Sequence, residues 1–237
     1  MEFIGTAAFW AALGNIILIN IVLSGDNAVV IALAAKSLPP KQKKMAVIWG
    51  SAAAIILRIV LTIFALQLLT LPYLKLIGAV LLFYIGVQLL AEGGDEENIE
   101  GHSNLWSAIK TILVADLVMS LDNVLGVAAA ANGNVTLLVV GLAISVPLIV
   151  FGSAIVLKLM EKFPIIITLG AALLGYLAGE MLFSDPIVVP WIAANIPHHE
   201  LALFGHSHLS IPGLALAIGV VIVGTYLSKR HNHAAAA

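Results

Sequence analysis

Two short stretches, Ser24-Gly25-Asp26-Asn27 and Ser120-Leu121-Asp122-Asn123, repeat one polar pattern inside long apolar runs of the chain. An ionised carboxylate at the centre of a bilayer costs about 2.5–3.5 kcal/mol on insertion scales. A buried polar group satisfied by neighbouring helices would explain one Asp-Asn pair better than a repeated pair. The repetition therefore indicates a function for both carboxylates.

The composition is that of a polytopic membrane protein. Hydrophobic residues make up 61% of the 237 residues, charged residues make up 10%, and the mean hydropathy is +1.09. These values fit no class of soluble domain. The chain has no cysteine, which excludes disulfides, thiolate metal sites and cysteine nucleophiles.

Apolar runs long enough to cross a hydrocarbon core of about 30 Å predict seven transmembrane helices. An α-helix satisfies its own backbone groups in lipid, so the predicted fold class is all-α. Gly25 beside Asp26 in the long first run predicts a local break that exposes backbone carbonyls. The runs are 8–35, 45–70, 73–91, 107–131, 136–159, 164–183 and 211–228.

The first three runs resemble the next three. An offset of 96 residues aligns Ser24, Asp26 and Asn27 with Ser120, Asp122 and Asn123, and an offset of 92 aligns Tyr84 with Tyr176. Three spans are an odd number, so the second copy enters the membrane from the opposite side and the repeats are inverted. The predicted division is 1–91 for the first repeat, 92–106 for an acidic cytoplasmic linker, 107–183 for the second repeat, 184–210 for an external His-rich loop, and 211–237 for a seventh helix with a tail.

Lysine and arginine in the short loops predict the orientation. Under the positive-inside rule they place the N-terminus outside and the C-terminus in the cytoplasm of a multi-pass cell-membrane protein. Only Lys75 falls on the opposite side, and Arg58 lies within a span. The residues on the cytoplasmic side are Lys36, Lys41, Lys43, Lys44, Lys110, Lys158, Lys162, Lys229 and Arg230.

The external loop and the linker are read as solvated segments. The loop has a weak alternative as a metal site, but its histidines show no closed ligand spacing, and we expect them to be dispensable for selectivity. A regulatory metal contact is the alternative for the linker. Three prolines are expected to break any helix in the loop. The prolines of the external loop are Pro186, Pro190 and Pro197, and its histidines and its acidic residue in the His-rich stretch are His198, His199, Glu200, His206 and His208.

The repeated motifs offer an all-oxygen set of ligands at matching depth. Asp26 precedes Lys36 by ten residues and Asp122 precedes Asn132 by ten, or about 15 Å of helix, half of the hydrocarbon core. Hard divalent cations such as Mn²⁺, Mg²⁺ and Ca²⁺ prefer about six oxygen ligands. The predicted metal-site residues are Asp26, Asn27, Asp122, Asn123, Ser24 and Ser120, with Asn20 and Asp116 as secondary positions.

Three further polar residues lie within the spans. Gln88 and Glu180 occupy equivalent positions of the two repeats, and a buried Glu180 is the candidate for proton linkage. Either one could instead be a second-shell residue or a satisfied polar group of the core. Arg58 has no counterpart in the second repeat, and a structural pairing with Asp116 or Glu180 is preferred to contact with a substrate.

At these motifs the sequence resembles the TerC family of integral membrane proteins, within the broader superfamily of LysE-type exporters. The resemblance covers nearly the whole chain and implies export of manganese(II) from the cytoplasm, with Asp26, Asn27, Asp122 and Asn123 as transport-site residues. Family members often carry acidic groups at the positions of Asn20 and Asp116, whereas position 20 here is an amide.

Two other readings stay open. A LysE-like exporter of an amino acid or other small solute would use a roomier, asymmetric site. A non-transporting factor could instead deliver metal to secreted enzymes. Neither reading involves an enzyme, a resident cofactor or a nucleic acid. The expected partners are the transported ion and the lipid bilayer, and the oligomeric state is not predicted.

Overall fold

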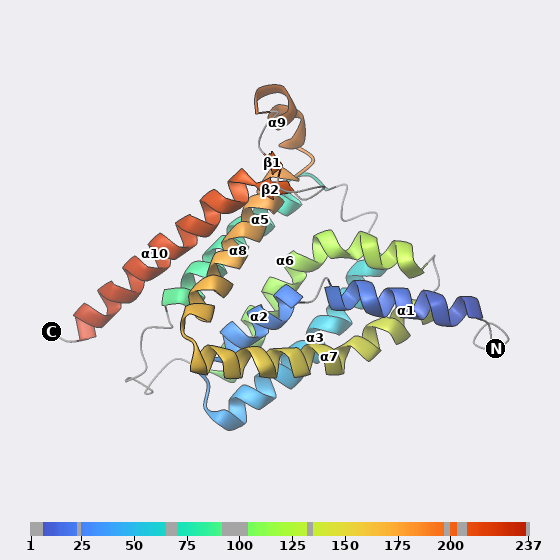
Figure 1. The fold of residues 1–237 in the computed structure, drawn as a ribbon, viewed down its shortest axis with the longest axis horizontal. Helices are drawn as coiled ribbons and strands as arrows, with labels where there is room; N and C mark the ends of the chain where they lie inside the picture. The colour runs from blue at the N-terminus through green and yellow to red at the C-terminus, as the bar shows by residue number, and fades with distance from the viewer. Residues whose placement is uncertain are drawn as a thin grey trace. The chain divides into compact units, whose positions relative to one another are not determined.

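The computed structural model describes residues 7–22, 25–64, 71–91, 104–131, 135–196, 200–202 and 208–235, and they are nearly all helical (Figure 1). Within these residues, the helices long and apolar enough to cross a bilayer are α3, α5, α7, α8 and α10, and α2 is a shorter apolar helix. The count of seven spans stays a prediction. The helices are α1 (Ala7–Val22), α2 (Gly25–Ala35), α3 (Pro40–Ile63), α5 (Leu74–Ala91), α6 (Leu105–Ala131), α7 (Val135–Lys162), α8 (Ile165–Phe183), α9 (Val189–Asn195) and α10 (Ile211–Ala235).

The first apolar run contains two helices. α1 ends at Val22 and α2 begins at Gly25, while residues 23–24 lie outside the described part of the chain. The second copy of the motif lies inside one continuous helix, α6. Leu121 stands there where the first copy has Gly25, and leucine favours the helix interior over glycine by about 1 kcal/mol. The two copies of the motif therefore lie in different local structures.

Among the predicted spans, the second differs most in its bounds from the helix in the structure. We expected a helix over 45–70, but α3 begins at Pro40 and ends at Ile63. Proline suits the first turn of a helix, because the amide proton that it lacks would have no helical partner there. The polar residues Lys41, Lys43 and Lys44 therefore lie in the first turns of α3 rather than in a loop before it.

The chain forms two compact units that do not follow the two repeats. The first unit holds residues 1–69 and 105–158, and the second holds residues 70–104 and 159–237. The first unit thus contains α1, α2 and α3 from the first half together with α6 and most of α7 from the second. The second unit contains α5, α8 and α10 with the short elements between α8 and α10.

Contacts in the first unit link the two halves of the chain in a reciprocal way. α3 packs along α6, and Gly50 of α3 lies against Ile112 of α6. α7 packs on α1 and α2, where Gly141 lies against Ile16 and Gly152 against Ala28. In each case the second helix of one predicted repeat contacts the first helix of the other. α1 and α2 also pack on α6, and the inverted arrangement of the repeats stays a prediction.

Close contact between α8 and α10 organises the second unit, in which α5 also packs on both helices (Figure 1). α8 carries Gly175 and Gly179 one turn apart, on the side that meets α10. A Cβ atom at Gly179 would lie 2.3 Å from the carbonyl oxygen of Pro212, and one at Gly175 would lie 2.5 Å from that of Leu216. Small residues at this spacing let two membrane helices approach at backbone distance.

The segment between α8 and α10 is more ordered than the sequence suggested. Pro190 does not break a helix but lies in the first turn of α9. Residues Glu200–Ala202 and His208–Ser210 form two antiparallel strands, β1 and β2. The amide of Ser210 donates to the hydroxyl of Tyr176 on α8, and Ser210 Oγ accepts from the amide of Gly213 as the N-cap of α10. Strand β2 therefore contacts both α8 and α10.

Asp185 ties the turn after α8 to the start of α5. Its carboxylate is buried and accepts hydrogen bonds from the backbone amides of Tyr73, Leu76 and Ile187, at 3.3, 3.1 and 3.0 Å. Tyr73 directly precedes α5 and has a left-handed backbone, with φ of 66°. Burial acts to raise the pKa of Asp185, but the backbone hydrogen bonds outweigh it and hold the pKa below its ordinary value. Asp185 thus caps α5 from a distant part of the chain.

We expect Asp185→Ala to destabilise the protein by about 2 kcal/mol near neutral pH, because it removes a charged cap and leaves amides without acceptors. The depressed pKa means that this contribution is complete above the unfolded-state value of about 3.9 and is lost as pH falls through the folded-state pKa. Thermal unfolding of both proteins in detergent from pH 7 down to pH 3 is the measurement. Curves that stay equally far apart at every pH would contradict the charged cap.

Candidate functional site

A buried ion pair joins α3 and α6 inside the first unit. The guanidinium of Arg58 contacts the carboxylate of Asp116, and the two side chains are 1% and 8% exposed. The predicted pairing of Arg58 with Asp116 or Glu180 is therefore confirmed for Asp116. A buried charge is tolerated when its partner and further hydrogen bonds compensate its lost hydration.

Ser120 completes this cluster on α6. Arg58 Nε donates to Ser120 Oγ at 3.0 Å, and Ser120 Oγ in turn donates to Asp116 Oδ2 at 3.2 Å. Asp116 and Ser120 are one helical turn apart, so both face α3 together. On α3 itself, Thr62 Oγ1 donates to the carbonyl oxygen of Arg58 at 2.7 Å. Two residues predicted as metal ligands, Asp116 and Ser120, are thus engaged with Arg58.

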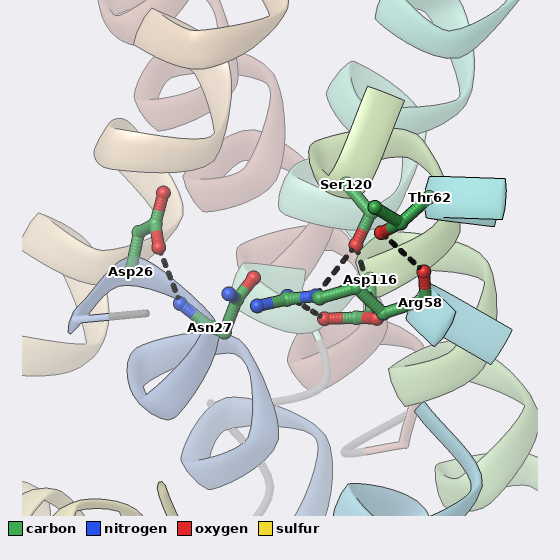
Figure 2. Close-up of polar contacts among 6 residues, drawn as sticks. All are labelled: Asp26, Asn27, Arg58, Thr62, Asp116 and Ser120. Atoms are coloured by element: carbon green, nitrogen blue, oxygen red, sulfur yellow. Dashed lines mark hydrogen bonds and ion pairs between the residues drawn. The ribbon is translucent and has the colours of Figure 1, made fainter. Parts of the chain in front are cut away.

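Asp26 and Asn27 lie in the first turn of α2, immediately after the interruption. The amide of Asn27 donates to Asp26 Oδ1 at 2.8 Å, and the Asn27 side chain is buried whereas Asp26 is half-buried. A negative side chain is stabilised at the positive end of a helix dipole. Figure 2 shows the guanidinium end of Arg58 directed toward the side of the cluster where Asn27 lies.

Helical geometry separates the polar positions of α6 into two faces. At about 100° per residue, Asn123 falls on the same face as Asp116 and Ser120, whereas position 122 is displaced from Asp116 by about 120° around the axis. Asn123 is half-buried. The face that meets Arg58 is therefore not the face on which residue 122 lies.

Several predicted site residues cannot be placed by their side chains. Ser24 lies outside the described residues, as do His198, His199 and His206, and most of the acidic linker. The side chains of Asn20, Asp122, Glu200 and His208 are likewise not described, although their backbones belong to α1, α6, β1 and β2. Among the residues that can be assessed, no group of three or more His, Cys, Asp or Glu side chains gathers as a metal cluster.

Glu180 does not have the burial that the proton-linkage prediction required. Its side chain is exposed on α8, while Gln88 on α5 is half-buried. The buried face of α8 is formed by Leu174, Ala178 and Met181 together with small glycines, and position 180 lies off that face. The proton-linkage role of Glu180 and Gln88 stays a prediction.

Comparisons with known proteins identify the family. The model of the integral membrane protein TerC family matches residues 5–232. The membrane protein YjbE of Bacillus subtilis is 47% identical over 167 residues, which cover 70% of this chain and 77% of YjbE. YceF of the same organism is 26% identical, over 93% of this chain and 84% of YceF.

A longer relative matches over part of its length. The inner membrane protein YoaE of Escherichia coli is 25% identical over 71% of this chain but only 36% of YoaE. No solved structure matches significantly. The family model covers nearly the whole chain, including both Asp-Asn motifs and Arg58, and agrees with the long apolar helices. The chain therefore belongs to the TerC family, as an integral multi-pass membrane protein in contact with the lipid bilayer.

Proposed function

We propose that the chain is a secondary transporter that exports a hard divalent cation from the cytoplasm, with manganese(II) as the favoured cargo. The cation passes through a site near the middle of the membrane that is formed by the two Asp-Asn motifs. The N-terminus lies outside and the C-terminus in the cytoplasm. The protein carries out no catalytic step, and the ion is its cargo rather than a resident cofactor.

The interruption between α1 and α2 is the observation that carries this proposal. The last four carbonyls of a helix have no partner within it, so the end of α1 offers backbone oxygens beside Asp26 and Asn27. Carbonyl, carboxylate and amide oxygens are the ligands that Mn²⁺ and Mg²⁺ prefer. Secondary transporters place their ion sites on such discontinuous helices, at the interface of inverted repeats.

The ion site centres on Asp26, Asn27, Asp122 and Asn123. Two carboxylates balance a 2+ ion in surroundings where net charge is costly. Ser24 and Asn20 lie near the interruption in sequence and complete the set on the first repeat. Asp116 and Ser120 belong to the neighbouring Arg58 cluster. Alternating movement of the two repeats would expose this site to each side of the membrane in turn.

Flux measurements on the purified protein test the proposal. We expect sealed vesicles containing only this protein to move Mn²⁺ across the membrane, as detected by quenching of an enclosed metal-sensitive dye, with protein-free vesicles as the control. Stoichiometric Mn²⁺ binding without flux would favour a metal-delivery factor instead. Uptake of a labelled amino acid that Mn²⁺ does not inhibit would favour an exporter of small solutes.

A further inference from the structure

We propose that Arg58, held by Asp116 and Ser120, sets the charge of the transport site so that it accepts one divalent ion, without contacting that ion. Arg58 is thus a specificity-determining residue that acts through its charge. This inference rests on the proposed function, because it concerns the valence of the cargo that the same site takes.

The charges within the first unit support this assignment. Away from the ends of the predicted spans, the first unit contains three carboxylates, Asp26, Asp116 and Asp122, and one cation, Arg58. The guanidinium therefore compensates one carboxylate and leaves two negative charges. One divalent ion makes this set neutral, which is the condition that a low-dielectric interior favours.

The contacts show which carboxylate Arg58 compensates. Asp116 receives the guanidinium directly, and Ser120 bridges the two side chains from the same face of α6. Position 122 lies on another face of α6, and Asp26 belongs to a different helix, α2. The structure thus pairs Asp116 with Arg58, and we assign the carboxylates of the two motifs to the ion.

A purely structural role explains these contacts less well. Breaking a buried ion pair is costly, but apolar residues of similar volume often hold two helices together equally well or better. The guanidinium end of Arg58 is directed toward Asn27, the residue that follows Asp26 in the first turn of α2 (Figure 2).

Changing the net charge should change the valence that the site prefers. Arg58→Gln leaves three negative charges, Asp116→Asn leaves one, and the double variant restores two. At an effective dielectric constant of about 20, one unit charge within about 10 Å changes the relative affinity for a trivalent and a divalent ion by about tenfold or more. The readout is competition between La³⁺ and Mn²⁺ for the purified protein in detergent, measured by calorimetry.

The two single variants are expected to change the ratio of La³⁺ to Mn²⁺ affinity in opposite directions. The ratio of La³⁺ to Mn²⁺ affinity should rise about tenfold in Arg58→Gln, fall about tenfold in Asp116→Asn, and return to within about threefold of wild type in the double variant. Arg58→Lys keeps the charge and should keep the ratio. Thr62→Val is the matched control, because it removes a neighbouring hydroxyl without changing any charge.

The outcomes separate this inference from the function on which it rests. Unchanged ratios in both folded single variants would show that the pair is only structural, and so would a folded double variant that does not recover the wild-type ratio. If the single variants do not fold, the double variant and Arg58→Lys still decide, since loss of the wild-type ratio in either overturns the inference. A wild-type protein that binds neither ion would overturn the proposed function and this inference together.

Discussion

Replacing either Asp26 or Asp122 by Asn should reduce manganese flux by about 100-fold or more, because one carboxylate no longer balances the divalent ion, and a unit charge about 4 Å away is worth about 4 kcal/mol at an effective dielectric constant of about 20. The double variant should be scarcely worse than either single variant. Residues that act as a unit show this non-additivity, since the first loss already destroys the site. Mn²⁺ binding and vesicle flux for the three variants, at matched protein amounts, are the measurements.

Asp185→Asn is the matched control, because it makes the same chemical change in the turn after α8, which belongs to the second unit and to neither motif. It should retain flux while lowering thermal stability. Near-normal flux in either motif variant, or two losses that simply multiply, would mean that the motifs serve separate purposes. Folding of the motif variants should be spared, because a neutral amide is less costly in a membrane than a carboxylate.

The second large effect is expected where α8 meets α10. Gly179→Ala would place a methyl group 2.3 Å from the carbonyl oxygen of Pro212, which belongs to the backbone and cannot rotate away. We expect a loss of about 3 kcal/mol, or about 10 °C in the thermal midpoint for a chain of this length. Gly14→Ala is the control, since nothing lies within 4 Å of a Cβ atom there. Equal midpoints for the two variants would show that α8 and α10 can separate without cost.

The sequence predicted most helix positions because hydropathy and helix length are local properties. It also predicted the break before Asp26, since α1 ends at Val22 and α2 begins at Gly25. It predicted Asp116 or Glu180 as the partner of Arg58, because an intramembrane arginine requires a carboxylate, and Asp116 is that partner. The burial of Glu180 depended instead on which face of α8 meets α10. That face is defined by Gly175 and Gly179, whose four-residue spacing is typical of close contacts between membrane helices.

The missed features depend on contacts between distant segments. The strands Glu200–Ala202 and His208–Ser210 have three residues each, too few for an alternating pattern to identify them. Asp185 caps a helix that begins more than a hundred residues earlier in the chain. An aspartate directly after a helix was a signal for a cap, but its target could not be read from the sequence. The function of α9 and of the hairpin beside it likewise does not follow from the local sequence.

The interleaving of the two halves has a consequence for synthesis. Arg58 and Asp116 are separated by 58 residues, and α3 finds its packing partner only when α6 has been made. At about 5–20 residues per second, the ribosome needs about 3–12 s to close that distance. During this time the side chain of Arg58 must stay in the membrane or the translocon without its partner, the carboxylate of Asp116. Insertion factors and quality control therefore have the longest access to this protein while only its first half has been synthesised.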